Sequence, residues 1–132
     1  MLFLDACTII YLLEAVDTRG DKVRNLVSAY LYRTKKPLMV SSLSLLECRV
    51  LPEREKNTSL LARYERFFTS DDVNIIEITH EVLKIATDLR ARYTIRTPDA
   101  LQAACALSQN ADDFVTGDKR FLSIQELQVT LV

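Results

Sequence analysis

Four acidic residues in this chain stand where their carboxylates could act together: Asp5, Glu47, Asp99 and Asp118. Clustered carboxylate oxygens suit Mg²⁺ or Mn²⁺, and a divalent ion relieves the repulsion among them. Two such ions about 4 Å apart can activate a water molecule and stabilise the leaving oxygen of a phosphodiester. That chemistry needs no side-chain nucleophile, and the chain has a single His and no nucleophile-elbow Ser or Cys–His signature.

Short apolar runs alternate with helical patterns along the chain, and these elements must position the acids. Strands are expected at 2–4, 38–40, 73–78 and 114–116, with a terminal edge strand at 129–131. Helices are expected from Thr8 to residue 14, over 21–33, 41–51 and 60–68, after Thr79, and from Thr97. This alternation predicts an α/β fold, a three-layer α/β/α sandwich with a central parallel sheet. The length of 132 residues and the hydrophobic content of 48% fit a single domain over residues 1–132.

Capping and proline rules give four explicit helix boundaries. Thr8 is expected to cap the first helix, and Ser42 or Ser44 the helix over 41–51. Pro52 is expected to end that helix. Thr97 is expected to cap a later helix, with Pro98 at its first position.

The positions of the acids relative to these elements favour a cluster of carboxylates at one edge of the sheet. Asp5 and Asp118 each follow a predicted strand, and Asp99 lies in the first turn of a helix. The carboxyl ends of parallel strands open onto one edge of the sheet, where ligands bind. Glu47 joins the others if its helix crosses that edge. Each residue also has a purely structural explanation as a helix cap, a favourable charge at a helix N-terminus, a turn residue or a solvated helix face.

Composition points to a cytoplasmic protein. Cys7, Cys48 and Cys105 cannot all pair within the chain, so we expect reduced thiols. No signal peptide is recognisable, and no apolar run is long enough to span a bilayer, so we expect no membrane association. The net charge of −1 does not exclude a nucleic-acid partner, because a cluster of four acids would leave the remaining chain mildly basic.

The segments around the four acids resemble those of the PIN domain family. They cover residues 4–12, 42–47, 97–104 and 115–121, stand in the family's order and span nearly the whole chain. Within the family, the likeness is greatest to the VapC-type ribonuclease toxins of bacterial toxin–antitoxin pairs. Two positions depart from the family pattern: Cys7, where many relatives have Ser or Asn, and Gly117, where Asn is frequent.

The resemblance implies a Mg²⁺-dependent endoribonuclease in which Mn²⁺ can substitute. The residues it implies are Asp5, Glu47, Asp99 and Asp118 as catalytic carboxylates and metal ligands, and Thr116 and Thr8 as hydroxyls that orient them. Lys119 and Arg120 flank Asp118 and are the expected substrate contacts. The implied partners are an RNA substrate, a cognate antitoxin protein and a second copy in a homodimer.

Other functions are compatible with parts of this pattern. An aspartyl-phosphate phosphatase also places an Asp after the first strand, but its second acid would fall at Cys7. A non-catalytic PIN-like scaffold that binds RNA or a protein would have no reason to keep the carboxylates. A PIN ribonuclease in RNA processing or decay has the same residues as a toxin, and the absence of an accessory domain favours the toxin.

Overall fold

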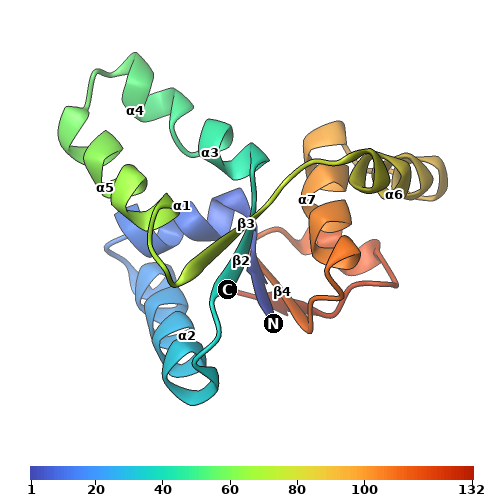
Figure 1. Cartoon of the computed structure of the whole chain (residues 1–132), viewed down its shortest axis with the longest axis horizontal. Coiled ribbons are helices and arrows are strands. Elements are labelled where there is room, and N and C mark those ends of the chain that lie inside the picture. Colours follow the sequence, from blue (N-terminus) through green and yellow to red (C-terminus); the bar gives the residue numbers. More distant parts are fainter.

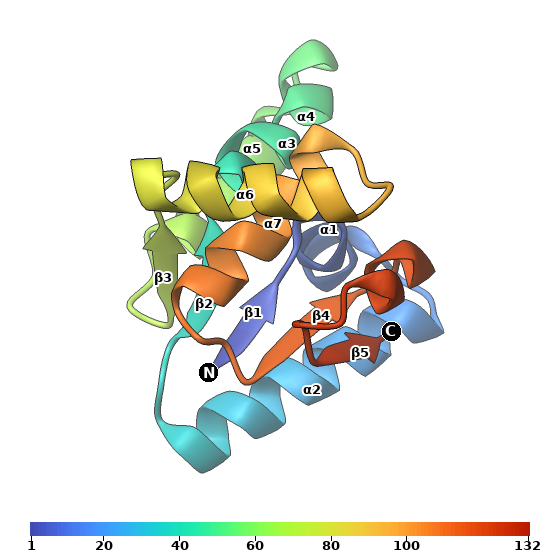
Figure 2. The same ribbon diagram turned by 90° about the vertical axis from the view of Figure 1, so that its right-hand side faces the viewer.

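A parallel sheet forms the centre of the molecule in the computed structural model, which describes residues 1–132. The strand order is β3-β2-β1-β4-β5, and every neighbouring pair is parallel (Figure 2). The strands are β1 (Leu2–Leu4), β2 (Leu38–Ser41), β3 (Val73–Ile76), β4 (Asp113–Thr116) and β5 (Val129–Leu131). All five predicted strands are present, and β5 is an edge strand as expected.

Helices cover both faces of the sheet, and the predicted three-layer α/β/α fold is confirmed. They are α1 (Ala6–Glu14), α2 (Thr18–Thr34), α3 (Leu43–Glu47), α4 (Val50–Arg54), α5 (Thr58–Phe68), α6 (His80–Arg92) and α7 (Thr97–Ser108), with a 3₁₀ helix, η1, over Lys119–Ser123. Helices α1, α2 and α5 lie on one face, and α6 and α7 lie on the other (Figures 1 and 2). No helix combines the length and the apolar character that a membrane crossing requires.

Alternating side chains of the strands divide the core into two apolar clusters. Leu2 and Leu4 of β1 pack with α1, α2 and α5, whereas Phe3 between them packs with α6 and α7. The Phe3 ring stacks on Phe114 of β4 with centroids 5.3 Å apart, and Phe121 of η1 lies 4.7 Å from Phe114. Since a central parallel strand is covered on both faces, β1 is apolar at every position.

The predicted cap of the first helix is wrong by three residues. Helix α1 begins at Ala6, and Asp5 is its N-cap, with a side-chain oxygen that accepts from the backbone N–H of Thr8. Aspartate is a stronger N-cap than threonine, and the strand ends directly before it. The Thr8 hydroxyl therefore points back to the acid.

Two later helices also differ from the predictions. The helix predicted over 41–51 is two short helices, α3 and α4, and Pro52 lies in the first turn of α4, where no N–H is needed. Neither Ser42 nor Ser44 is a side-chain cap of α3, whose N-cap position holds Ser42 without a capping hydrogen bond. Helix α7 begins at Thr97, so the N-cap position falls on Arg96 and Pro98 is the second helical residue, each one residue from the prediction. The Thr97 hydroxyl instead accepts from the Arg90 guanidinium.

The aromatic stack gives a stability prediction. We expect Phe114→Ala to lower the free energy of unfolding by about 3–5 kcal/mol, because it empties a fully covered position between two rings. Urea unfolding followed by circular dichroism measures this loss. Leu122→Ala in η1, where the side chain is 55% exposed, is the control and should change stability little. A loss at Phe114 no larger than at Leu122 would contradict the packing described.

Candidate active site at the carboxyl edge of the sheet

Asp5 is a buried acid at the carboxyl end of β1, with only 4% of its surface exposed. Its Oδ1 accepts from the Thr8 backbone N–H at 2.9 Å and lies 2.7 Å from the Thr8 hydroxyl. The same hydroxyl is 2.8 Å from the Val115 carbonyl oxygen, so it is held between β4 and the acid. The first turn of α1 thus holds the Asp5 carboxylate at the end of the strand.

Thr116 connects Asp5 to Asp118. The pairing of Leu4 with Val115 places the end of β1 beside the end of β4. There the Thr116 hydroxyl donates to Asp5 Oδ2 at 2.6 Å and accepts from the backbone N–H of Asp118 at 3.0 Å. One hydroxyl therefore contacts the carboxylate of one predicted ligand and the backbone of another.

The environment of Asp5 favours its protonated form. Burial raises the pKa of the Asp5 carboxyl, the hydrogen bonds from Thr116 and Thr8 oppose that rise, and the negative charge of Asp118 adds to it. A buried carboxylate beside a second carboxylate is costly unless a cation balances the charge. This is the charge arrangement expected of a cation-binding site.

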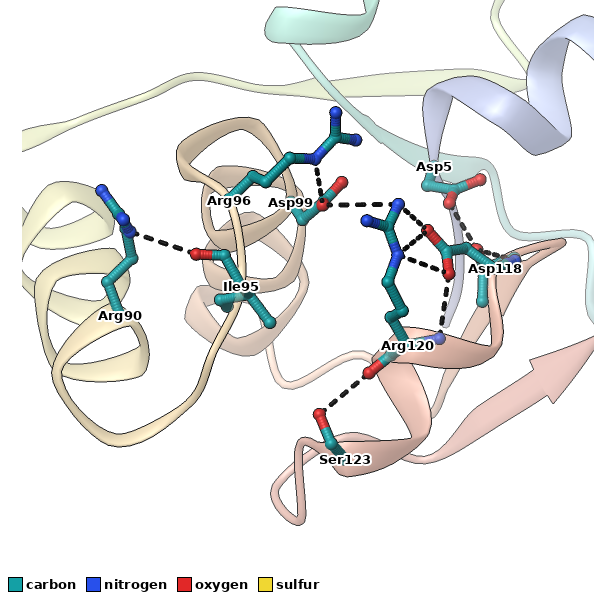
Figure 3. Close-up of polar contacts among 9 residues, drawn as sticks. Asp5, Arg90, Ile95, Arg96, Asp99, Asp118, Arg120 and Ser123 are labelled. Atoms are coloured by element: carbon teal, nitrogen blue, oxygen red, sulfur yellow. Dashed lines mark hydrogen bonds and ion pairs between the residues drawn. The ribbon is translucent and has the colours of Figure 1, made fainter.

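Two arginines balance the two more accessible acids (Figure 3). Arg120 Nη2 lies 2.6 Å from Asp118 Oδ2, and Arg120 Nε lies 3.0 Å from each Asp118 oxygen. The same Nη2 is 4.0 Å from Asp99 Oδ2. Asp99 Oδ2 also accepts a hydrogen bond from Arg96 Nε at 3.2 Å. The guanidinium of Arg120 thus lies between the carboxylates of Asp99 and Asp118, where it occupies the position of a bridging cation.

These ion pairs shift two ionisation equilibria. The side-chain hydrogen bond with Arg120 lowers the pKa of the Asp118 carboxyl, and the bond with Asp118 raises the pKa of the Arg120 guanidinium. Asp118 is 26% exposed and Asp99 18% exposed, so both carboxylates are accessible to solvent and to a ligand. Asp118 therefore stays ionised and available as an oxygen donor at neutral pH.

Glu47 contacts α7, the helix that carries Asp99, through Gln102. Glu47 Oε1 accepts from Gln102 Nε2 at 2.9 Å, and the same nitrogen lies 3.0 Å from Ser44 Oγ. Gln102 is buried in α7, three residues after Asp99, and its Oε1 has no hydrogen-bond partner. Helix α3 thus places Glu47 beside Gln102 of α7.

The structure brings Asp5, Asp99 and Asp118 to one edge of the sheet (Figure 3). Thr8 and Thr116 contact Asp5 there. No three His, Cys, Asp or Glu side chains lie close enough together to hold a metal ion in the conformation described. The hard oxygen donors of this edge nevertheless suit Mg²⁺ or Mn²⁺, provided that Arg120 leaves its place between two of them. Lys119 is exposed, and Arg120 pairs with acids.

Sequence reasoning missed Gln102 and the pairing of Arg120. Gln102 follows Asp99 at a spacing of three residues, which places both on one face of a helix, and that signal was available. The position of Arg120 between Asp99 and Asp118 depends on how η1 docks beside α7, and no spacing in the sequence indicates it. Gln102 is accordingly a residue that holds Glu47 in place.

The fold and the site define a parallel α/β/α domain with acidic residues gathered at the carboxyl ends of its strands. The chain belongs to the PIN domain family, whose family model matches residues 2–127. A comparison with curated protein sequences gave no match.

Several solved structures are similar to this chain over nearly its whole length. The VapBC2 complex of Rickettsia felis bound to promoter DNA matches with a TM-score of 0.82 at 20% identity, covering 99% of this chain and 98% of the other. The VapC20 toxin of Mycobacterium tuberculosis, which cleaves the sarcin–ricin loop, matches with a TM-score of 0.75 at 19% identity, covering 97% and 99%. A toxin–antitoxin complex from Klebsiella pneumoniae has a TM-score of 0.78 at 20% identity, covering 98% and 96%. At these identities the likeness defines the fold.

The burial of Asp5 gives a pH-dependent prediction. Burial raises the pKa of Asp5 in the folded protein above its value in the unfolded chain, which is about 3.9. Protonated Asp5 therefore contributes to the free energy of unfolding at pH values below the unfolded-state pKa. That contribution is lost as pH rises through the folded-state pKa. The asparagine of Asp5→Asn has no ionisable group, so this variant does not lose stability in the same way. We therefore expect the stability of Asp5→Asn to rise relative to that of the wild type as pH increases from acidic to neutral. Urea unfolding at a series of pH values, with a chelator present, measures the difference.

Asp71→Asn is the matched control for this experiment, because Asp71 is exposed. Its stability difference from the wild type should stay nearly constant over the same pH range. Parallel stability curves for the wild type and Asp5→Asn would show that burial of Asp5 does not shift its ionisation.

Proposed function

We propose that this chain is a metal-dependent endoribonuclease and the toxin of a toxin–antitoxin pair. The observation that carries the proposal is the meeting of Asp5, Asp99 and Asp118 at one edge of the sheet, with the Arg120 guanidinium between Asp99 and Asp118. Membership of the PIN domain family supports a nuclease, and similarity to solved toxin structures supports a toxin. The non-catalytic scaffold is less favoured, because a scaffold gains nothing from a buried acid such as Asp5.

Mg²⁺, or Mn²⁺ in its place, is the proposed cofactor, and Asp5, Glu47, Asp99 and Asp118 are the residues that would hold it. When bound, the ion supplies an activated water and charge stabilisation for cleavage of an RNA phosphodiester. The donor set fits this ion, because all four side chains offer carboxylate oxygens.

The chain's own residues supply orientation and charge. Thr8 and Thr116 hold the Asp5 carboxylate by its two oxygens, and Gln102 holds Glu47 by one. Carboxylates that are already oriented do not have to be ordered when the cation binds. Arg120 and Arg96 offset negative charge of Asp118 and Asp99, and with the ion bound Arg120 would be free to contact the phosphate backbone of the RNA.

The proposed partners follow from the same assignment. Similar folds occur in toxin–antitoxin complexes of Rickettsia felis and Klebsiella pneumoniae, which supports an antitoxin protein as the partner of this chain. RNA is the proposed substrate, and Lys119 and Arg120 beside Asp118 remain proposed contacts. A homodimer and a cytoplasmic location complete the proposal.

Removal of one site carboxylate tests the activity. We expect Asp99→Asn to lower Mg²⁺-dependent cleavage of single-stranded RNA by at least about a hundredfold, because an amide is a poor ligand for the ion. Gel analysis of a labelled RNA measures the rate, and circular dichroism checks the fold. Asp71→Asn is the control and should cleave like the wild type. Full activity of Asp99→Asn would refute the assignment.

Competition between Arg120 and the metal gives a test that does not need activity. A ligand at a hundred times its Kd stabilises the folded state by about 2.7 kcal/mol, so Mn²⁺ should raise the melting temperature of the wild type. We expect Arg120→Gln to reach the same rise at a lower Mn²⁺ concentration, because the guanidinium that bridges Asp99 and Asp118 is then gone, although Arg96 still pairs with Asp99.

Arg92→Gln is the matched control, since Arg92 forms ion pairs with Asp88 and Glu126 outside the site. It should leave the Mn²⁺ titration unchanged. A titration curve for Arg120→Gln that is identical to the wild-type curve would show that Arg120 does not compete with the ion.

A further inference from the structure

A hollow of about 580 Å³ opens beside Asp99. Figure 3 shows four of the residues around it, Arg90, Ile95, Arg96 and Arg120. The hollow lies between the connection from α6 to α7 and the start of η1. Its lining is Arg90, Tyr93, Thr94, Ile95, Arg96, Asp99, Arg120 and Phe121. Three guanidinium groups and one carboxylate meet in this hollow, so its walls carry a positive excess.

Arg90 differs from the other two arginines of the hollow. Arg96 and Arg120 are paired with Asp99 and Asp118, whereas Arg90 has no carboxylate within 4.0 Å. Its Nε donates to the Ile95 carbonyl oxygen at 3.2 Å and its Nη1 to the Thr97 hydroxyl at 2.9 Å. Both acceptors are neutral, so the positive charge of Arg90 is held in place and not balanced.

A fixed guanidinium with unused N–H groups is suited to a phosphate, which accepts two parallel hydrogen bonds from it. Holding it in advance also lowers the entropy that binding must overcome. Thr97, which holds Arg90, lies only two positions before Asp99 in the first turn of α7. A phosphate on Arg90 is therefore near the acidic edge but separate from it.

We propose that this hollow is a binding subsite for RNA, in which Arg90 holds a phosphate next to the one that is cleaved. The inference rests on the proposed function, because it names a second contact for the same substrate. With a divalent ion on the carboxylates of Asp99 and Asp118, Arg96 and Arg120 would be free to join Arg90. The subsite thus becomes more positive as the acidic edge is filled, and RNA and the cation bind cooperatively.

RNA binding by Arg90→Gln tests the subsite in an Asp5→Asn background with Mg²⁺, where the RNA stays intact. Fluorescence anisotropy with a short labelled single-stranded RNA gives Kd at several salt concentrations. We expect Kd to rise on the order of tenfold and the slope of log K against log salt to become shallower by about 0.7, the loss of one phosphate contact. Arg90→Lys keeps the charge and should keep the slope.

Arg66→Gln is the matched control, because Arg66 is exposed in α5 and makes no ion pair. It changes the net charge by the same amount and should leave Kd and the salt slope near their original values. An unchanged slope in Arg90→Gln, an equal effect in Arg66→Gln, or no RNA binding by the Asp5→Asn parent would each overturn the subsite.

The outcomes separate the subsite from the proposed activity. If the wild type cleaves RNA but Arg90→Gln binds and cleaves equally well, only the subsite is wrong. If the wild type cleaves no RNA but Arg90→Gln loses binding with the shallower salt slope, the subsite stands and the proposed activity fails. In an active enzyme, Arg90→Gln should raise KM more than it lowers kcat, since the contact is made equally in the ground and transition states.

Discussion

The hydrogen bond between Thr116 and Asp5 is the interaction on which the site depends. It joins the ends of two adjacent parallel strands, and it exists only because the pairing of Leu4 with Val115 brings those ends level. An acid buried as deeply as Asp5 would be costly without such donors. The same hydroxyl accepts from the Asp118 backbone, so the position of the second acid depends on the first.

Charge balance is the second constraint on this edge of the sheet. Three carboxylates near one another repel, and the chain relieves that repulsion with Arg120 and Arg96 at short distances from Asp118 and Asp99. Ion pairs that are partly exposed contribute little to stability, so their main consequence is a smaller net negative charge at the site. A divalent ion would serve the same purpose with more charge, and the arginines would then be available to an anionic substrate.

The sequence predicted much of the architecture for identifiable reasons. Each strand is a short apolar run, and alternation with helical patterns indicates parallel pairing. The predictions were wrong where two local rules competed for the same helix boundary. Thr8 and Asp5 are both good caps, and the acid caps because it stands directly at the strand end. Pro52 was expected to end a helix, but proline is equally suited to the first turn of one, where the structure places it.

The sequence by itself determined which residues are acids at strand ends and helix starts, because those positions follow from local apolar patterns and capping. Only the tertiary structure decided what each acid contacts. Gln102 reaches Glu47 across 55 residues, and Arg120 stands between Asp118 and an acid on another helix. Such contacts depend on how α3, α7 and η1 dock around the sheet. Docking is set by the packing of the whole core, which no local pattern records.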